Sequence, residues 1–197
     1  MSTHSTVHHW VRFRRVCRRH FRLHPIRIGG PGIRVYIDEH FMSVRKNMRG
    51  GRVRRRSVWI FGGVEHGSSH SFMVPVFRRR AVDLLPPLRR YIRPGSNIYS
   101  DEWRAYRQIR LPQYRHLMYR HLTVNHRHHF VDPLTGIHTQ RIENKWGQWK
   151  SEVRRIKGVP LRQLRSRIAE FLWRERFGDD PFYHFWSHVL ELYPIDH

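Results

Sequence analysis

Carboxylates are scarce in this chain, and those of its central part are the side chains best suited to chemistry. Eight of them lie between Ile33 and Lys150: Asp38, Glu39, Glu65, Asp83, Asp101, Glu102, Asp132 and Glu143. Asp38 and Asp101 stand at or near the ends of strand-like runs, and Glu143 opens a helix-like run. Strand ends and helix starts can meet at one sheet edge, where three carboxylates repel one another unless cations lie between them. A site for Mg²⁺ is built in this way, and in a basic protein it suggests phosphodiester chemistry.

Asp38 and Asp101 each have an acidic neighbour, Glu39 and Glu102. Successive side chains of a strand point to opposite faces, so at most one member of each pair can face the site. Composition alone leaves open which member does.

Residues 140–156 have the spacing of an amphipathic helix. Apolar residues recur every three or four positions and form the stripe expected to be buried: Ile142, Trp146, Trp149, Val153 and Ile156. A neighbouring stripe contains Glu143, Gly147, Lys150 and Arg154. Lys150 lies about 10 Å beyond Glu143 along the helix, at roughly 1.5 Å per residue, so a metal-bound carboxylate and this lysine could hold one DNA strand. The alternative is an exposed glutamate at a helix N-terminus, where the helix dipole favours it.

The sequence pattern also indicates the elements that position these residues. Apolar runs predict strands at 33–41, 58–66, 71–77, 121–131 and, in a short form ending near Asp101, within 94–103. Helical patterns cover 78–92, disturbed by Pro86 and Pro87, then a stretch from about 140, and finally 161–177. Three strands, a helix, two further strands and more helices fit an α/β domain built on one central sheet.

The flanking segments differ in composition from this central domain, which we place at 33–178. Residues 1–32 are basic and histidine-rich, with a short helix expected before the break "IGGPG". Residues 179–197 form an aromatic tail. Cys17, His20 and His24 have ligand-like spacing, but zinc needs a fourth ligand, and surface histidines on a basic helix are the simpler interpretation.

The charge balance points to a polyanionic partner. Lys and Arg total 38 against 15 Asp and Glu, a net charge of +23, and nucleic acid is the commonest polyanion that such a field attracts. The arginines of 45–56, with Arg54 and Arg55 among them, form either a phosphate-holding hairpin or a solvated loop. The sequence shows no long apolar run and a single cysteine, Cys17. We therefore expect a soluble intracellular protein with no membrane association.

Several segments, in a fixed order, resemble the DDE transposase domain of the Merlin superfamily and the related bacterial insertion-sequence transposases of the ISXO2-like group. They are "VYIDEHF", "VWIFGGVEHG", "MVPV", "YSDEWRAY", "HLTVNHRHHFVDPLTGIHTQRIENKWGQWK" and "FLWRERFG". The resemblance covers roughly residues 28–178. Its specificity comes from the ordered set, above all from the run that begins with "VNH" and ends with "WGQWK".

The resemblance implies an RNase H-like fold, with a central mixed sheet flanked by helices and three carboxylates that bind two divalent ions, Mg²⁺ or Mn²⁺. The first aspartate of the family falls on Asp38, the second on Asp101 and the final glutamate on Glu143. Lys150 matches the lysine that follows this glutamate, and His138 the histidine before it. In such sites the metals activate a water and stabilise the leaving oxygen at a scissile phosphate, and the freed 3′-hydroxyl then attacks target DNA.

The same resemblance implies partners. Transposon ends and target DNA are expected, together with further copies of this chain. The compartment is the nucleus in a eukaryote, or the cytoplasm and nucleoid in a bacterium. Residues that we expect to contact DNA are Lys150, His138, Arg154, Arg54 and Arg55. Asn125 and His126 fall on the "NH" of the family pattern and are expected near the metal ligands or the DNA.

Some features depart from the family pattern. Gln140 replaces the usual asparagine of "HTN", and His40 stands where a small residue is more usual. Residues 1–32 resemble the end of an upstream DNA-recognition region, which suggests a truncated, decayed or domesticated copy. Two classes of function therefore stay open: a metal-dependent DNA transposase, and a non-catalytic DNA-binding protein derived from one. Retention of all three acids favours the enzyme.

Overall fold

The computed structural model describes residues 3–46, 54–123 and 140–194. Its helices are α1 (Thr3–Leu23), α2 (Ala81–Tyr91), α3 (Gln140–Arg155), α4 (Leu164–Phe177) and α5 (Pro181–Leu192), with 3₁₀ helices η1 (Arg104–Arg110), η2 (Pro112–Leu117) and η3 (Leu161–Gln163). Its strands are β1 (Arg34–Lys46), β2 (Arg54–Glu65), β3 (Ser71–Val76), β4 (Asn97–Ser100) and β5 (Arg120–Thr123). The chain is thus a mixed α/β protein, and the predicted order of strands and helices is confirmed.

Strand β1 is the middle strand of one five-stranded sheet with the order β3-β2-β1-β4-β5. Strands β1, β2 and β3 pair antiparallel, whereas β4 runs parallel to β1 and β5 parallel to β4. Tyr36 of β1 pairs with Tyr99 of β4. Asp38 and Asp101 each follow two residues after these tyrosines, so the parallel register brings both aspartates to the same level of neighbouring chain segments.

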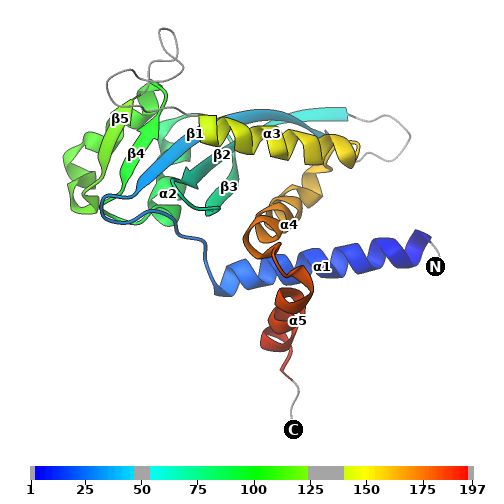
Figure 1. Cartoon of the computed structure of the whole chain (residues 1–197). Coiled ribbons are helices and arrows are strands. Elements are labelled where there is room, and N and C mark those ends of the chain that lie inside the picture. Colours follow the sequence, from blue (N-terminus) through cyan, green and yellow to red (C-terminus); the bar gives the residue numbers. More distant parts are fainter. Residues whose placement is uncertain (1–2, 47–53, 124–139, 195–197) are drawn as a thin grey trace.

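Helix α3 lies along the sheet and contacts β1 and β2 (Figure 1). Trp149 Nε1 donates a hydrogen bond to Met42 Sδ at 3.4 Å. Trp146 packs over Gly62, where a Cβ atom would lie 2.6 Å from the indole ring. The predicted apolar stripe of this helix is confirmed, because Ile142, Trp146 and Trp149 are buried.

Helices α1, α4 and α5 gather beside the sheet (Figure 1). Helix α4 packs against β3 and α1, and α5 packs against α1. Trp173 of α4 is fully buried and its Nε1 donates to His188 Nδ1 of α5 at 3.0 Å. Phe13 of α1 contacts the rings of Trp173 and Phe185, each at 5.3 Å between centroids. The aromatic tail of the sequence therefore contains a helix whose rings pack onto α1 and α4.

Two helices differ from what the sequence suggested. Helix α1 is longer than the short helix expected there, and Arg14, Val16, Cys17 and His20 are buried along it. Helix α2 continues through Pro86 and Pro87, and burial of its leucines outweighs the backbone hydrogen bonds that the prolines cannot make. Within the described ranges, no helix combines the length and the apolar character needed to cross a membrane.

Candidate active site

Asp38 is a half-buried carboxylate on the face of β1 that α3 covers. Its Oδ2 accepts a hydrogen bond from Trp146 Nε1 at 2.9 Å, and its Oδ1 accepts one from the backbone N–H of Glu39 at 2.7 Å. Burial raises the pKa of Asp38 to about 6, and the nearby charge of Asp101 adds to the rise, while the two hydrogen bonds and Arg79 oppose it. The negative charge of Asp38 is therefore incompletely compensated, which is the condition that a bound cation relieves.

Glu39 points to the opposite side of the strand, as the alternation of side chains requires. Its carboxylate accepts hydrogen bonds from the hydroxyl of Tyr106 in η1 and from Arg79 Nε, the latter at 3.0 Å. A further nitrogen, Arg79 Nη2, lies 2.8 Å from Glu39 Oε2. Of this acidic pair, Glu39 is thus held in an internal ion pair, and Asp38 is the member that faces α3.

Asp101 begins the segment that follows β4. Its Oδ1 accepts a hydrogen bond from the backbone N–H of Trp103 at 3.0 Å, and its Oδ2 lies 3.6 Å from Arg79 Nη2. The Arg79 guanidinium also lies over the Trp103 ring at 4.3 Å and the Trp59 ring at 4.9 Å. One arginine therefore holds the carboxylate of Asp101 beside that of Glu39, while Glu102 is exposed.

The exposed side of α3 carries Glu143, Lys150 and Arg154. Lys150 and Arg154 line a groove of about 290 Å³ together with His40 of β1. The imidazole of His40 stacks on Trp146 at 5.4 Å between centroids. Burial lowers the pKa of His40 to about 4, and the charge of Lys150 lowers it further in the same direction. The neutral imidazole of His40, two positions after Asp38 on β1, thus lies in a groove with two cations of α3.

Glu143 lies on α3 one turn before Trp146 and lines a hollow between α3 and α4 with Gly147 and Arg174. Asp38, Asp101 and Glu143 are all among the described residues, and their ligand atoms do not all lie within 4.8 Å of one another. The structure therefore brings Asp38 and Asp101 into mutual electrostatic contact and places Glu143 on the helix that Trp146 attaches to Asp38.

A different group of ligands does meet that distance. His20, His24 and Glu191 place their ligand atoms within 4.8 Å of one another, and no other group of three or more does so in the part of the chain that the structure describes. Glu191 of α5 contacts His24 Nε2 and lies 3.8 Å from His20 Nδ1. Cys17 is fully buried and burial raises the pKa of its thiol, so it is not part of this group.

Sequence reasoning missed three residues of the site: Arg79, Tyr106 and Trp146. Trp146 was expected in the core, but nothing in its spacing indicated that the indole N–H would reach a carboxylate. Arg79 is the middle one of three successive arginines, and Tyr106 lies in a segment without a clear periodicity. Only the tertiary structure brings these side chains to Asp38, Glu39 and Asp101.

Several other predicted residues lie partly or wholly outside the part of the chain that the structure describes. His138, Asn125 and His126 fall outside the described residues. Arg54 and Arg55 lie in β2, where their backbones pair with Lys46 and Arg45 of β1, and their side chains are outside the described part. Their predicted contacts with DNA stay predictions.

Comparison with known proteins gives two matches. Residues 29–176, most of the chain, match the family of the ISXO2-like transposase domain. An uncharacterized transposase-like protein of Haemophilus influenzae is 26% identical over 103 residues, which cover 52% of this chain and 78% of that protein. No solved structure matches the chain.

Proposed function

Because this chain belongs to the ISXO2-like transposase domain family, we propose that it is a DDE-type DNA transposase that cuts and joins DNA strands with the help of divalent metal ions. The observation that supports the proposal is the pair Asp38 and Asp101: each follows two residues after a tyrosine of the Tyr36–Tyr99 pair of β1 and β4, and the charge of Asp101 contributes to the raised pKa of Asp38. Glu143 on α3 is the proposed third acid.

The residues at this position fit a divalent metal. Asp38 is a half-buried carboxylate close to the charge of a second carboxylate, Asp101. Hard oxygen donors of this kind suit Mg²⁺ and Mn²⁺. When bound, the metal would polarise a phosphate and lower the pKa of a water. Asp38 and Asp101 would hold it, with Glu143 completing the set.

The surrounding side chains have positioning roles in this proposal. Trp146 fixes one oxygen of Asp38, and Arg79 fixes Asp101, so both carboxylates have defined orientations. Lys150 and Arg154 supply positive charge beside the acids, where the phosphates of a DNA strand would lie. His40 lines the same groove as Lys150 and Arg154 but is neutral, so it adds no positive charge beside the proposed metal ligands.

The strand order also supports an RNase H-like fold as a proposal. Three antiparallel strands are followed by two parallel strands that extend the sheet beyond the first one. The proposed first acid lies on that first strand, and the second directly follows β4. The narrower assignment to the Merlin superfamily stays a prediction, as does assembly with further copies of the chain.

The alternative is a DNA-binding protein derived from a transposase that no longer catalyses. Strand transfer of a pre-cleaved transposon end, taken from the DNA that flanks the gene, separates the two in Mg²⁺ or Mn²⁺. We expect product from the wild type, none from Asp38→Asn, Asp101→Asn or Glu143→Gln, and wild-type amounts from the exposed control Glu102→Gln. Equal activity in wild type and all three acid variants would overturn the site assignment. No product from the wild type, with DNA binding retained, would support the alternative.

A further inference from the structure

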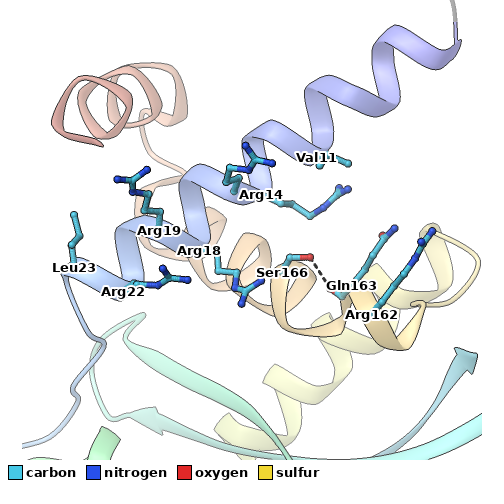
Figure 2. Close-up of a pocket in the computed structure, with 10 residues that line it drawn as sticks. Val11, Arg14, Arg18, Arg19, Arg22, Leu23, Arg162, Gln163 and Ser166 are labelled. Atoms are coloured by element: carbon cyan, nitrogen blue, oxygen red, sulfur yellow. Dashed lines mark hydrogen bonds between the residues drawn. The ribbon is translucent and has the colours of Figure 1, made fainter. Parts of the chain in front are cut away.

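A concentration of positive charge lies in a hollow away from the proposed metal ligands. Helix α1, α4 and the 3₁₀ turn before α4 enclose a groove of about 650 Å³ (Figure 2). Six arginines line it: Arg14, Arg15, Arg18, Arg19, Arg22 and Arg162. Among the described residues that line this arginine groove, there is no carboxylate. Gln163 and Ser166 add neutral polar groups at its α4 side.

The helical repeat explains why the arginines of α1 gather on one side. Arg14, Arg18 and Arg22 recur every four residues, and Arg15 lies three residues before Arg18, so their side chains follow one face of the helix. Figure 2 shows this row opposite Arg162 and Gln163. Like charges at such spacings destabilise a helix, and packing α1 against α4 adds Arg162 to the same hollow. The fold therefore concentrates repulsion here instead of dispersing it.

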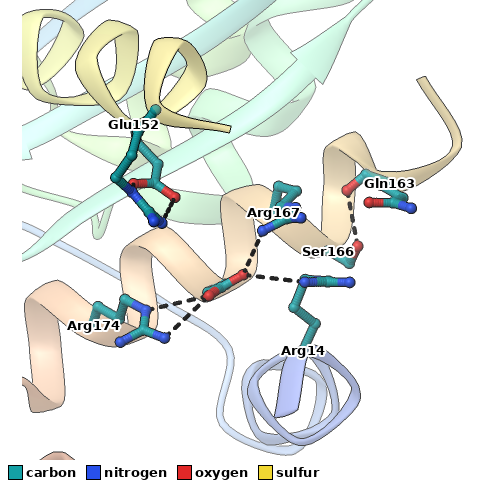
Figure 3. Close-up of polar contacts among 8 residues, drawn as sticks. Arg14, Glu152, Gln163, Ser166, Arg167 and Arg174 are labelled. Atoms are coloured by element: carbon teal, nitrogen blue, oxygen red, sulfur yellow. Dashed lines mark hydrogen bonds and ion pairs between the residues drawn. The ribbon is translucent and has the colours of Figure 1, made fainter. Parts of the chain in front are cut away.

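Glu170, the carboxylate that pairs with Arg14, is shared by three arginines. Glu170 of α4 lies 3.7 Å from Arg14, 3.4 Å from Arg167 and 3.2 Å from Arg174 (Figure 3). Its side chain is only 5% exposed. Glu152 of α3, which pairs with Arg155, is a second carboxylate close to these arginines. Two negative charges against four positive ones leave this interface with an excess of positive charge.

Arg14 is a buried cation whose charge is only partly compensated by Glu170. Its side chain is nearly completely buried, and its Nη1 atom has no hydrogen-bond partner. Burial, followed by the charge of Arg167, lowers the pKa of its guanidinium although Glu170 opposes this. A buried, incompletely paired cation is costly, and arginine nitrogens are suited to phosphate oxygens.

We propose that the arginine groove binds the phosphate backbone of DNA, as a second contact separate from the one at Asp38. Along α1, Arg14 and Arg22 are eight residues apart, which is about 12 Å of helix and spans about three phosphates of one strand. Contacts of this kind hold DNA without reading its sequence. Only the choice of DNA as the polyanion rests on the proposed function. The groove needs neither metal nor Asp38.

Fluorescence anisotropy with a labelled duplex DNA in EDTA tests the proposal. The groove variant is Arg18→Gln, Arg22→Gln and Arg162→Gln in one chain, and the control is Arg107→Gln, Arg115→Gln and Arg120→Gln. All six positions are exposed, and both variants lose the same charge. We expect the groove variant to lose about tenfold or more in affinity, and its salt dependence to become shallower by about two to three in the slope of log K against log salt. The control should lose less than about threefold.

Equal losses in the two variants, or no loss in the groove variant, would overturn the proposal. The groove variant should lose the same factor in affinity with Mg²⁺ present as in EDTA, which separates this contact from the proposed metal ligands. If the groove variant fails to bind DNA and wild type shows no strand transfer, the groove proposal is supported and the proposed function is refuted. If the groove variant binds normally while wild type transfers strands, the groove alone is refuted.

Discussion

Trp146 Nε1 donates a hydrogen bond to Asp38 Oδ2 over 2.9 Å and so joins α3 to β1 across 108 positions of sequence. The indole lies over Gly62 of β2 on one side and stacks with His40 on another. The helix that carries Glu143 and Lys150 is therefore attached to the strand of Asp38 through this side chain, in addition to the bond from Trp149 to Met42. This contact is the first that we would disturb.

Trp146→Phe keeps an aromatic ring in the core but removes the donor to Asp38. Hydrogen bonds that orient a metal ligand typically contribute 10- to 100-fold to metal affinity or activity. We expect strand transfer to fall by about tenfold, with a higher Mg²⁺ concentration needed for half-maximal activity. A Mg²⁺ titration of the strand-transfer rate measures both.

Trp149→Phe is the matched control for that change. It removes an equally buried indole from the same helix, but its N–H bonds to Met42 Sδ and not to a carboxylate. Both variants should lose stability to a similar extent in urea unfolding, whereas only Trp146→Phe should shift the Mg²⁺ dependence. The same Mg²⁺ shift in both variants would show that loosening of α3, and not the bond to Asp38, is responsible.

Gly62→Ala should displace the indole of Trp146. The new Cβ would lie 2.6 Å from the ring and 3.2 Å from the carbonyl oxygen of Phe72, and crowding of this kind costs about 1 to 3 kcal/mol. We expect a lower urea midpoint and altered tryptophan fluorescence. Gly147→Ala in α3 meets no atom within 4 Å and should stabilise the protein by about 0.5 to 1 kcal/mol. A stabilised Gly62→Ala protein would contradict the packing described for Trp146.

Asp38→Asn should stabilise the metal-free protein while abolishing catalysis. The pKa of Asp38 is raised in the folded state to about 6 from an ordinary 3.8. The protonated side chain therefore stabilises the folded state below pH 3.8, and this stabilisation is lost as the pH rises through 6. Removing the charge should raise the free energy of unfolding at pH 7.5 by roughly 1 to 2 kcal/mol, once the loss of one hydrogen bond is subtracted. Urea unfolding in EDTA at pH 7.5 and pH 4 measures this gain, which should vanish at the lower pH. Asp101→Asn, whose carboxylate faces Arg79, should show no comparable gain.

The sequence predicted helix α3 because the buried residues recur with the helical repeat. Trp146 and Trp149 recur with that repeat and are buried, and the exposed stripe of Glu143 and Lys150 follows beside them. Lys145 shows the limit of the same reasoning. It lies on the buried side and pairs with Glu175 of α4, a partner 30 positions away that periodicity cannot indicate.

The candidate site was predictable only in part for a related reason. Asp101 directly follows β4, as the local pattern predicted, but the expected strand end near Asp38 was wrong, because β1 continues to Lys46 and Asp38 lies within it. Arg79 and Tyr106 come from segments that tertiary packing brings to Glu39. In a chain with 38 lysines and arginines, no local signal distinguishes the one arginine that joins two carboxylates. Which member of the Asp38–Glu39 pair faces α3 was likewise decided by the strand's register.

Two buried histidines predict that the fold loses stability in acid. Burial lowers the pKa of His20 to about 4, and so do its neighbours His188 and His24. Burial, followed by Arg110, lowers the pKa of His121 to about 4. In the unfolded chain both titrate near their ordinary 6.5. Between pH 6.5 and 4 the unfolded state therefore binds more protons, and stability falls as the pH falls through this window.

His121 offers the sharper test because its hydrogen bonds fix its protonation. Ser100 Oγ donates to the carbonyl of Asp101 at 2.7 Å, so His121 Nε2 must donate to Ser100 Oγ over 2.9 Å. Nδ1 then carries the lone pair, is buried and has no hydrogen-bond partner, so a proton there would be a buried and unpaired charge. We expect the free energy of unfolding to fall by roughly 1 to 3 kcal/mol for this residue between pH 7 and 5. His121→Gln, compared with the exposed control His116→Gln in urea unfolding at both values, should flatten the pH dependence; an unchanged slope in His121→Gln would show that other groups govern it.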